Sequence, residues 1–390
     1  MSTPGFDVVI VGGGIAGLWC RWSLVNAGYS VALLERSALA HGQTGASQGI
    51  LHRGVKYAMS PDASRAAAAA DSSAQAWDQA MSGRAGPDLT SVRVLAKSML
   101  MWTDAGILSR ITGAVASRLL TSHVERLTDE QIPPLVRAPA RAAYRVGETV
   151  IDAVSAAHAL GAAVKGVMAR TAVRSIMPTG GMHRLETECG SIEARAVVLC
   201  AGQGNGELLA MLGEDPAQWM QLRDLHMVAA RGAPGELFGH WIAAASDKPR
   251  LTITSGQDGG VVWYIGGDLA ERGVSRSESE QIAAARQELG ACFRDLALEQ
   301  MSFSTIRIAR AEGKDKFGKR PDGPVVREVA GKASGGRVFA VWPTKLVMAP
   351  VAAAQLLEML GAVTGPSLSG ASLGGCASPD YALPPWVRHR

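Results

Sequence analysis

The clearest chemical signature in the chain is a cluster of glycines near its N-terminus. From Gly12 to Gly17 the sequence reads Gly-Gly-Gly-Ile-Ala-Gly, which matches the pattern G-x-G-x-x-G. In this pattern the first glycine allows a tight turn, the second lets the backbone approach a pyrophosphate, and the third lets a helix pack closely on a strand. The helix that follows directs unpaired N–H groups at the phosphates. The spacing therefore predicts a dinucleotide-binding turn at Gly12, Gly14 and Gly17, with Ile15 and Ala16 inside it.

The segments on either side of the turn have the composition that such a site requires. Residues 6–11 form an apolar run typical of a strand buried on both faces. Apolar residues at helical spacing then continue to Gly28, which favours a helix ending there. A second strand should end at Glu35, where the pattern places an acid that binds a ribose diol. A carboxylate there disfavours a 2′-phosphate, so NADP is not expected.

The loop after Glu35 helps to distinguish two cofactors that share this turn. Residues 42–57 are rich in Gly, Ser, Thr and Gln. A plain NAD domain would proceed to its next strand and helix within a few residues. A long polar loop instead indicates backbone amides and hydroxyls that line a larger ligand, such as the flavin end of FAD.

The chain resembles the D-amino-acid-oxidase-like (DAO) family of FAD oxidoreductases at four places. After the glycine turn, residues 50–57 read Ile-Leu-His-Arg-Gly-Val-Lys-Tyr, similar to a segment of the glycerol-3-phosphate dehydrogenase and L-2-hydroxyglutarate oxidase branch. Residues 196–202 form an apolar run that ends in Ala-Gly, and residues 337–360 predict a strand, a turn and a helix. The resemblance implies an FAD-dependent oxidoreductase. Some members of the family attach FAD covalently through His or Cys, but no attachment motif is clear in this sequence, so we expect noncovalent FAD.

The resemblance also assigns cofactor contacts to residues spread along the chain. Besides the turn, these residues are Glu35, Arg36, Thr44, Gly45, Ser47, Gln48, Gly49, Val173, Ala201, Gly202, Thr344, Lys345 and Leu346. Most of them would contact FAD through small or backbone groups.

The family resemblance predicts an α/β fold in which a Rossmann-like FAD-binding domain is interleaved with an α+β substrate domain built on a mixed sheet. The FAD-binding domain would comprise residues 1–90, 149–211 and 313–390, and the substrate domain residues 91–148 and 212–312. Strands of the mixed sheet are expected over residues 225–232, 250–256, 261–268 and 302–310.

In this family a hydride leaves a substrate C–H for flavin N5, and the protein handles the accompanying charges. Lys345 would lie beside the flavin and favour the anionic reduced form or bind an anionic substrate. Lys56 and Tyr57 would contact the substrate's anionic group, with Lys56 in place of the more usual Arg. Arg307 matches an anion-binding position, but Arg310 competes with it, and strand alternation puts the two on opposite faces.

Two histidines are candidates for contact with the reacting atoms. His226 could accept a hydroxyl proton as a neutral imidazole, although a lone histidine in a strand is more often a structural hydrogen bonder. His52 precedes the Lys56–Tyr57 pair and would contact flavin or substrate.

Composition and charge argue against several other classes. Lys and Arg exceed Asp and Glu only enough to give a net charge of +4, spread along the chain, so we expect no nucleic-acid partner. No apolar run is long enough to span a membrane, and the N-terminus lacks the basic start of a signal peptide. We therefore expect a cytoplasmic protein, although its modest positive charge would favour peripheral contact with an anionic membrane.

The cysteines indicate neither a disulfide framework nor a metal site. The chain has five, Cys20, Cys189, Cys200, Cys292 and Cys376, without C-x-x-C spacing. We therefore expect no bound metal. Cys20 and Cys200 lie among apolar residues and should behave as small buried hydrophobes.

Three functions remain open at this stage. The first is a dehydrogenase or oxidase that acts on a small anionic alcohol, either a 2-hydroxy acid or a polyol phosphate, and passes electrons to oxygen or a quinone. The second is an amine or amino-acid oxidase of the glycine- or sarcosine-oxidase type. The third is a binding protein that retains FAD without turnover.

Overall fold

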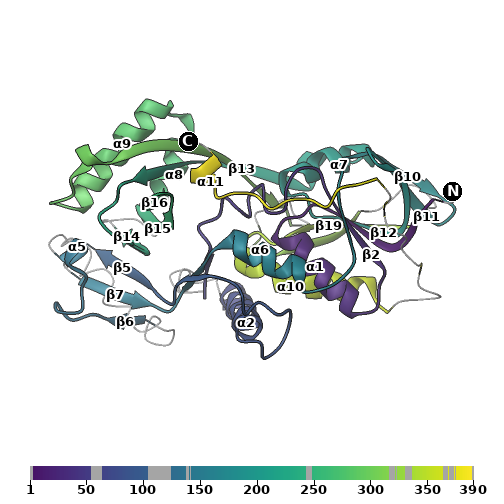
Figure 1. The fold of residues 1–390 in the computed structure, drawn as a ribbon, viewed down its shortest axis with the longest axis horizontal. Helices are drawn as coiled ribbons and strands as arrows, with labels where there is room; N and C mark the ends of the chain where they lie inside the picture. Colours follow the sequence, from purple (N-terminus) through teal and green to yellow (C-terminus); the bar gives the residue numbers. More distant parts are fainter. Residues whose placement is uncertain are drawn as a thin grey trace.

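The computed structural model describes residues 3–53, 64–103, 124–137, 140, 142–242, 248–315, 321, 323–329, 336–362, 368, 373 and 375–388. Two large sheets lie side by side along the long axis of the molecule (Figure 1). The predicted pair Lys56 and Tyr57 lies outside the described residues.

The first sheet is mostly parallel and contains the predicted nucleotide-binding strands. It has the order β10-β11-β12-β1-β2-β9, with β19 between β12 and β18. The bounds are β1 (Gly5–Val11), β2 (Val31–Glu35), β9 (Val167–Arg170), β10 (Val173–Thr179), β11 (Met182–Thr187), β12 (Gly190–Leu199), β18 (Val325–Val329) and β19 (Arg337–Trp342). The pairs β1–β2, β1–β12, β2–β9 and β12–β19 are parallel. Their carboxyl ends therefore meet at one edge, where α/β sheets bind ligands.

The central strand β1 is buried on both faces, as its unbroken apolar run predicts. Val8 and Ile10 belong to the hydrophobic core on one side of the sheet, and Val9 and Val11 to the core on the other. Helix α1 (Ile15–Asn26) follows the glycine turn, and Gly28 just beyond it takes a left-handed φ of 88°. The predicted strand–turn–helix–strand unit is thus present.

Helices pack on the first sheet and on one another. Helix α1 packs against α6 (Ala153–Ala162) and α10 (Ala349–Leu360), and α10 contacts α2 (Ser64–Met81) (Figure 1). Asp152 caps α6 by accepting hydrogen bonds from the backbone N–H groups of Val154 and Ser155. The other helices of the described residues are α5 (Pro134–Arg137), α7 (Asn205–Met211), α8 (Asp268–Arg272), α9 (Glu278–Cys292) and α11 (Pro385–Arg388). Short 3₁₀ turns are η2 (Gly202–Gly204), η3 (Pro216–Gln218), η4 (Gly273–Ser275), η5 (Leu298–Gln300) and η6 (Leu346–Met348).

The second sheet is mixed, as predicted for the substrate side. Its order is β17-β13-β16-β15-β14-β5-β7-β6, and only the β14–β5 pair among these is parallel. The bounds are β5 (Met99–Thr103), β6 (Val124–Arg126), β7 (Ala142–Val146), β13 (Met220–Arg231), β14 (Gly239–Ile242), β15 (Leu251–Gln257), β16 (Val261–Gly266) and β17 (Ser302–Gly313). A small sheet of β3 (Ile50–Leu51), β8 (Thr149–Ile151) and β4 (Val94–Ala96) completes the strands of the described residues. The predicted α/β class with a mixed second sheet is confirmed.

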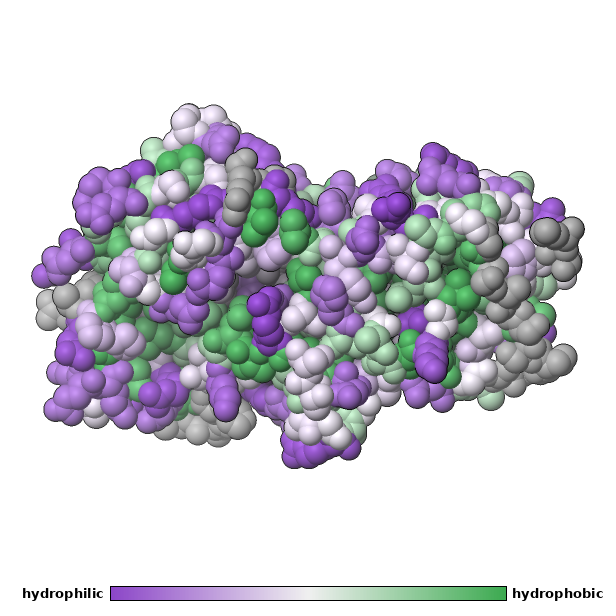
Figure 2. Space-filling model, viewed as in Figure 1, coloured by the Kyte–Doolittle hydropathy of each residue, from purple (hydrophilic) through white to green (hydrophobic). Residues whose placement is uncertain are grey.

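The surface drawn in Figure 2 carries interspersed hydrophilic and hydrophobic side chains. Within the described part of the chain, none of the helices combines the length and apolar character needed to cross a bilayer.

One expectation about the cysteines is corrected. Cys189 and Cys376 form a disulfide across a sequence separation of 187 residues, whereas Cys20, Cys200 and Cys292 are buried and not part of a disulfide. The C-terminal segment runs beside β9, where the N–H of Arg170 donates to the carbonyl of Ala377. Short-range cysteine spacing cannot reveal a pair that only the tertiary fold brings together.

Candidate active site

The glycine turn between β1 and α1 has a backbone geometry that side chains would not tolerate. Gly12 has a φ of 116°, and a Cβ added there would lie 2.5 Å from the carbonyl oxygen of Cys200. A Cβ on Gly17 would lie 2.0 Å from the carbonyl oxygen of Gly12. The N-cap of α1, Gly14, contributes no side-chain hydrogen bond to the helix. The turn therefore presents helix N–H groups and bare backbone, which suit a pyrophosphate.

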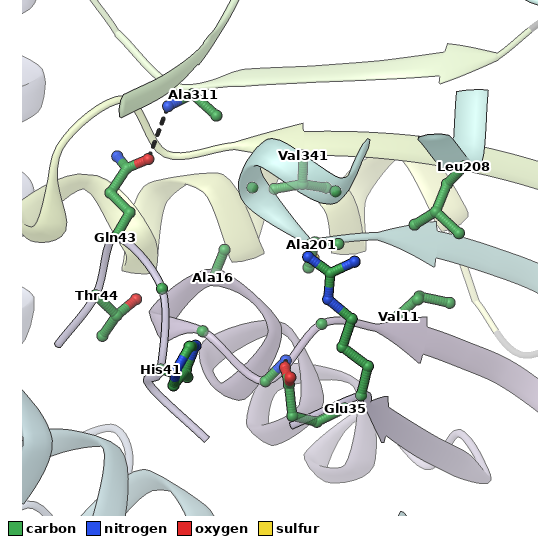
Figure 3. Close-up of a pocket in the computed structure, with 18 of the residues that line it drawn as sticks. Val11, Ala16, Glu35, His41, Gln43, Thr44, Ala201, Leu208, Ala311 and Val341 are labelled. Carbon is green, nitrogen blue, oxygen red and sulfur yellow. Dashed lines mark hydrogen bonds between the residues drawn. The ribbon is translucent and has the colours of Figure 1, made fainter. Parts of the chain in front are cut away.

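A cleft of about 440 Å³ lies over this turn and the carboxyl ends of the parallel strands (Figure 3). It brings together most of the residues predicted to hold the cofactor. These are Gly12, Gly14, Ile15, Ala16, Glu35, Arg36, Thr44, Ser47, Val173, Ala201, Gly202, Lys345 and Leu346. The shape and chemistry of the cleft thus fit a dinucleotide.

Glu35 and Thr44 hold the loops that border the turn. Glu35 accepts hydrogen bonds from the N–H of Gly13 at 2.7 Å and from the N–H of Ser37 at 2.9 Å. The Oγ1 of Thr44 accepts from the N–H of Ile15 at 3.0 Å. The carboxylate of Glu35 is therefore fixed at the mouth of the cleft, where a ribose would lie.

Two predicted glycines act through packing rather than by lining the cleft. Gly17 sits against the backbone of Gly12, as described above. Gly45 packs on the carbonyl of Ala40, which a Cβ would approach to 2.4 Å. Sequence reasoning missed Gln43, which lines the cleft and accepts a hydrogen bond from the N–H of Ala311 at 2.9 Å (Figure 3).

A second cavity of about 300 Å³ adjoins the cleft. The two share Gln43, Ser47, Lys345 and Leu346 as lining residues. The predicted residues His52, Gln48, Gly49 and Thr344 line this second cavity. A ligand as long as FAD could occupy the cleft with one end and reach the second cavity with the other.

A buried glutamate on the wall of the second cavity lies between two histidines. The Oε2 of Glu148 is 3.1 Å from Nδ1 of His52 and 3.6 Å from Nε2 of His240. Nδ1 of His240 is in turn 2.9 Å from the Oγ1 of Thr252. Among the described residues, no group of His, Cys, Asp or Glu has the arrangement to hold a metal ion. The cluster thus consists of two hydrogen-bonded pairs, His52–Glu148 and His240–Thr252, with His240 and Glu148 in ion-pair contact between them.

The protein environment sets the charges in this cluster. Burial lowers the pKa of His52; the carboxylate of Glu148 opposes this effect, and the nearby charge of Lys345 adds to it. Burial would raise the pKa of Glu148, but the charge and hydrogen bonds of His52 and His240 prevail and hold it well below its usual range. At neutral pH the arrangement is thus a neutral His52 beside an ionised Glu148.

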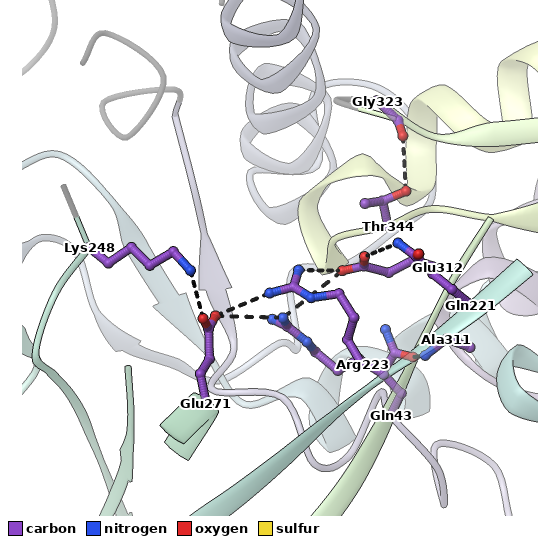
Figure 4. Close-up of polar contacts among 10 residues, drawn as sticks. Gln43, Gln221, Arg223, Lys248, Glu271, Ala311, Glu312, Gly323 and Thr344 are labelled. Atoms are coloured by element: carbon purple, nitrogen blue, oxygen red, sulfur yellow. Dashed lines mark hydrogen bonds and ion pairs between the residues drawn. The ribbon is translucent and has the colours of Figure 1, made fainter. Parts of the chain in front are cut away.

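Three charged residues that line the cavity, Lys248, Glu271 and Arg310, belong to a network of opposite charges (Figure 4). Glu271 is 2.8 Å from Nζ of Lys248 and 3.2 Å from Arg223, which also contacts Glu312 at 3.1 Å. Arg310 lines the cavity and lies 3.9 Å from Glu271. The network presents both cations and carboxylates to a bound molecule.

The structure answers which of the two competing arginines faces the cavity. Strands β13 and β17 pair so that His226 lies opposite Arg307, while Leu225 and Ile308 line the cavity. Side chains alternate along a strand, so Arg310 points in with Ile308. The expectation for Arg307 is corrected, because it donates to the carbonyls of Val274 and Arg276 at 2.9 and 2.6 Å.

His226, the candidate general base, has instead the structural role that a lone histidine in a strand more often takes. Its ring is buried on the opposite face of β13, with Nδ1 2.9 Å from the carbonyl oxygen of Gly273, and it lines neither cavity. The sequence offered no local signal for Glu148, His240, Lys248 or Glu271, which reach the cavity from separate elements.

A dinucleotide-binding enzyme is defined by the strand–turn–helix unit, the cleft and the adjoining cavity. The second sheet contributes to the wall of that cavity, where the reaction would take place. Residues 7–350 match the family described as DAO, FAD dependent oxidoreductase, and the chain belongs to this family. It is therefore an FAD-dependent oxidoreductase, and the non-catalytic alternative is set aside.

Individual relatives agree with this assignment. The chain is 36% identical to the probable FAD-dependent oxidoreductase PA4991 of Pseudomonas aeruginosa over 97% of each chain. The crystal structure of that protein superposes with a TM-score of 0.78 and 32% identity, covering 100% of this chain and 99% of the other.

More distant structures share the fold. Glycine oxidase from Geobacillus kaustophilus has a TM-score of 0.64 at 22% identity, covering 96% of this chain and all of the other. FAD-bound L-α-glycerophosphate oxidase from Mycoplasma pneumoniae has a TM-score of 0.68 at 16% identity, covering 95% and 98% of the two chains. A glycine oxidase and a glycerophosphate oxidase thus share this fold.

Proposed function

We propose that the enzyme oxidises a small anionic alcohol, either a 2-hydroxy acid or a polyol phosphate, with noncovalent FAD. The observation that carries the proposal is the position of His52 on the cavity wall, with its Nδ1 3.1 Å from Glu148; burial and the charge of Lys345 lower its pKa, which favours the neutral imidazole. An alcohol must lose its hydroxyl proton as it is oxidised, and a neutral imidazole is suited to accept it.

The residues of the cleft and cavity would divide the work. Gly12, Gly14 and the start of α1 would bind the pyrophosphate, and Glu35 the ribose. The substrate would give the hydride of its C–H bond to bound FAD and its hydroxyl proton to His52, leaving a carbonyl product. The two electrons that leave the substrate with the hydride would then pass to oxygen or a quinone.

Cations at the cavity support an anionic substrate. Lys345 lines both the cleft and the cavity, and Lys248 and Arg310 line the cavity. We assign the substrate's carboxylate or phosphate to this region, because a charged group buried in a cavity needs a partner of opposite charge. The segment of residues 50–57 supports the glycerol-3-phosphate dehydrogenase and L-2-hydroxyglutarate oxidase branch.

A second candidate is an amine or amino-acid oxidase. Glu271 and Asp268 also line the cavity, beside Lys248 and Arg310, and this mixture of charges suits a zwitterion. The ammonium group of a zwitterion must lose one proton before the amine is oxidised, so His52 would have a proton to accept in this reaction as well.

We also propose the interleaved domain division given above. It is supported by sheet membership, since β5 to β7 and β13 to β17 share the second sheet, whereas β1, β2, β9 to β12, β18 and β19 form the first.

The experiment is an anaerobic reduction assay on the purified enzyme. Its visible spectrum should have an oxidised-flavin band at about 450 nm. Panels of 2-hydroxy acids, polyol phosphates and amino acids are then added separately without oxygen. Bleaching by members of the first two panels supports the proposal, whereas bleaching by amino acids alone favours the second candidate. If trichloroacetic acid leaves the flavin on the protein, the noncovalent assignment is wrong.

A further inference from the structure

The second cavity contains a polar chain that no single segment of the sequence provides. His52 follows β3, Glu148 links β7 to β8, and His240 and Thr252 lie on β14 and β15. Glu148 is only 3% exposed, and Thr252 is also buried. Four separate elements therefore contribute one residue each, and only the folded protein assembles the chain.

The direction of each hydrogen bond follows from the carboxylate. An ionised carboxylate has no proton and can only accept, so Nδ1 of His52 must donate to Oε2 of Glu148 across their 3.1 Å separation. A neutral imidazole carries one N–H, and Nε2 of His52 is then left with a lone pair. Glu148 thus selects the tautomer of His52.

His240 fits the same scheme from the other side. Its Nε2 faces Oε2 of Glu148 at 3.6 Å, and its Nδ1 lies 2.9 Å from the hydroxyl of Thr252. If Thr252 donates its O–H to Nδ1, then Nε2–H points at the carboxylate. The rings of His52 and His240 are stacked with centroids 6.4 Å apart and planes 22° apart. The ring nitrogens Nδ1 of His52 and Nε2 of His240 both face Oε2 of Glu148.

We infer that Glu148, supported by His240 and Thr252, is a positioning residue that keeps the proton of neutral His52 on Nδ1 and leaves Nε2 able to accept the substrate's hydroxyl proton. The inference rests on the proposed alcohol oxidation for its catalytic consequence. In the step, one proton moves from the substrate oxygen to Nε2 and converts His52 to an imidazolium. The negative charge of Glu148 offsets the positive charge that forms.

Among the described residues, three charged or titratable groups act on the ring of His52. These are Glu148 from the β7–β8 link, His240 from β14, and Lys345 from the start of η6. Glu148 favours the imidazolium, whereas Lys345 and burial disfavour it. Replacing Glu148 by a neutral amide should therefore lower the pKa of His52 further and weaken it as a base.

The direct test is the tautomer of His52 in the FAD-bound protein, before any substrate is added. The protein is labelled with ¹⁵N-histidine, the His52 signals are assigned by their loss in His52→Gln, and two-bond ¹H–¹⁵N correlations identify the protonated nitrogen. We expect the Nδ1–H form in the native protein. An Nε2–H form there would overturn the inference without any variant of Glu148.

Three substitutions extend the test to the reaction. Glu148→Gln should leave His52 as a mixture of tautomers, lower its pKa, and slow anaerobic flavin reduction by about 100-fold with little change in substrate KM. His240→Gln keeps the carboxylate, so it should keep the tautomer and slow reduction less. The matched control is Glu288→Gln, which removes another buried carboxylate of the second-sheet region that pairs with Arg250. It should leave the His52 signals unchanged.

The outcomes separate this inference from the proposed function. A native tautomer and a native reduction rate in Glu148→Gln would overturn the inference even if alcohols reduce the flavin. An Nδ1–H tautomer that depends on Glu148 would sustain it structurally even if no alcohol reduces the flavin, in which case the proposed function fails.

Discussion

Adding a single methyl group at Gly17 should weaken FAD binding. In the structure, a Cβ at this position would lie 2.0 Å from the carbonyl oxygen of Gly12, more than an ångström inside ordinary van der Waals contact. The clashing atom belongs to the backbone and cannot rotate away, so Gly17→Ala must shift α1 or open the turn. Both changes displace the N–H groups that would bind the pyrophosphate.

The expected size of the effect follows from the cost of overpacking. Forcing extra atoms into a tight site costs about 1–3 kcal/mol. If this cost falls on the FAD-bound state, the Kd for FAD rises by about 5- to 150-fold. The assay measures FAD affinity by fluorescence as the apoprotein is titrated, with the melting temperature of each apoprotein recorded alongside.

A matched control adds the same methyl group where space exists. A Cβ on Gly235 would meet nothing within 4 Å, and its φ is not left-handed. Gly235→Ala should therefore bind FAD as tightly as the native protein. A native Kd in Gly17→Ala would refute the argument that this turn must be bare backbone.

Three further predictions concern the second cavity. Lys345→Ala should retain FAD but slow anaerobic flavin reduction by more than about tenfold, since it removes a cation from the reacting region. Stopped-flow absorbance measures the rate of flavin reduction. An unchanged rate would contradict the role of Lys345 beside the flavin and the anionic substrate. Arg310→Ala should raise KM for the anionic substrate by about 10- to 150-fold, because it removes a hydrogen bond to a charged group. Arg307→Ala, on the opposite face of β17, should change KM by less than about twofold. Equal effects of the two substitutions would contradict the orientation of β17. Burial lowers the pKa of His52, so its neutral imidazole form should persist below the ordinary pKa of about 6.5. The rate of flavin reduction should therefore be flat at neutral pH and fall only as the pH drops through that lowered pKa. A pH–rate profile with its midpoint above about 6.5 would contradict a neutral base at this position.

The cofactor half of the site could be predicted because its signals are local. The glycine turn, the apolar strand before it and Glu35 after it lie within one short stretch of chain. The local backbone conformation requires these residue types, such as a glycine at position 12, where φ is 116°. Covalent neighbours therefore carried most of the information.

The substrate half could be predicted only in part, because long-range pairing builds it. Alternation in residues 302–310 indicated that one of Arg307 and Arg310 faces inward, but apolar neighbours on both sides of the strand left the choice open. The register of β13 and β17 decides it. Glu148 and His240 gave no sequence signal because their partners lie in other elements, and the Cys189–Cys376 pair is hidden by its separation in the same way.

The central claim is that the enzyme oxidises an anionic alcohol and uses His52 to take the hydroxyl proton. The most direct measurement compares a 2-hydroxy acid or polyol phosphate found to reduce the flavin with its analogue in which an amino group replaces the hydroxyl. Stopped-flow reduction is followed without oxygen in the native enzyme and in His52→Gln. We predict that the alcohol reduces the flavin faster than its amino analogue does. We also predict that His52→Gln slows flavin reduction by the alcohol by about 100-fold or more. Faster reduction by the amine, or an alcohol rate that does not depend on His52, would contradict the account.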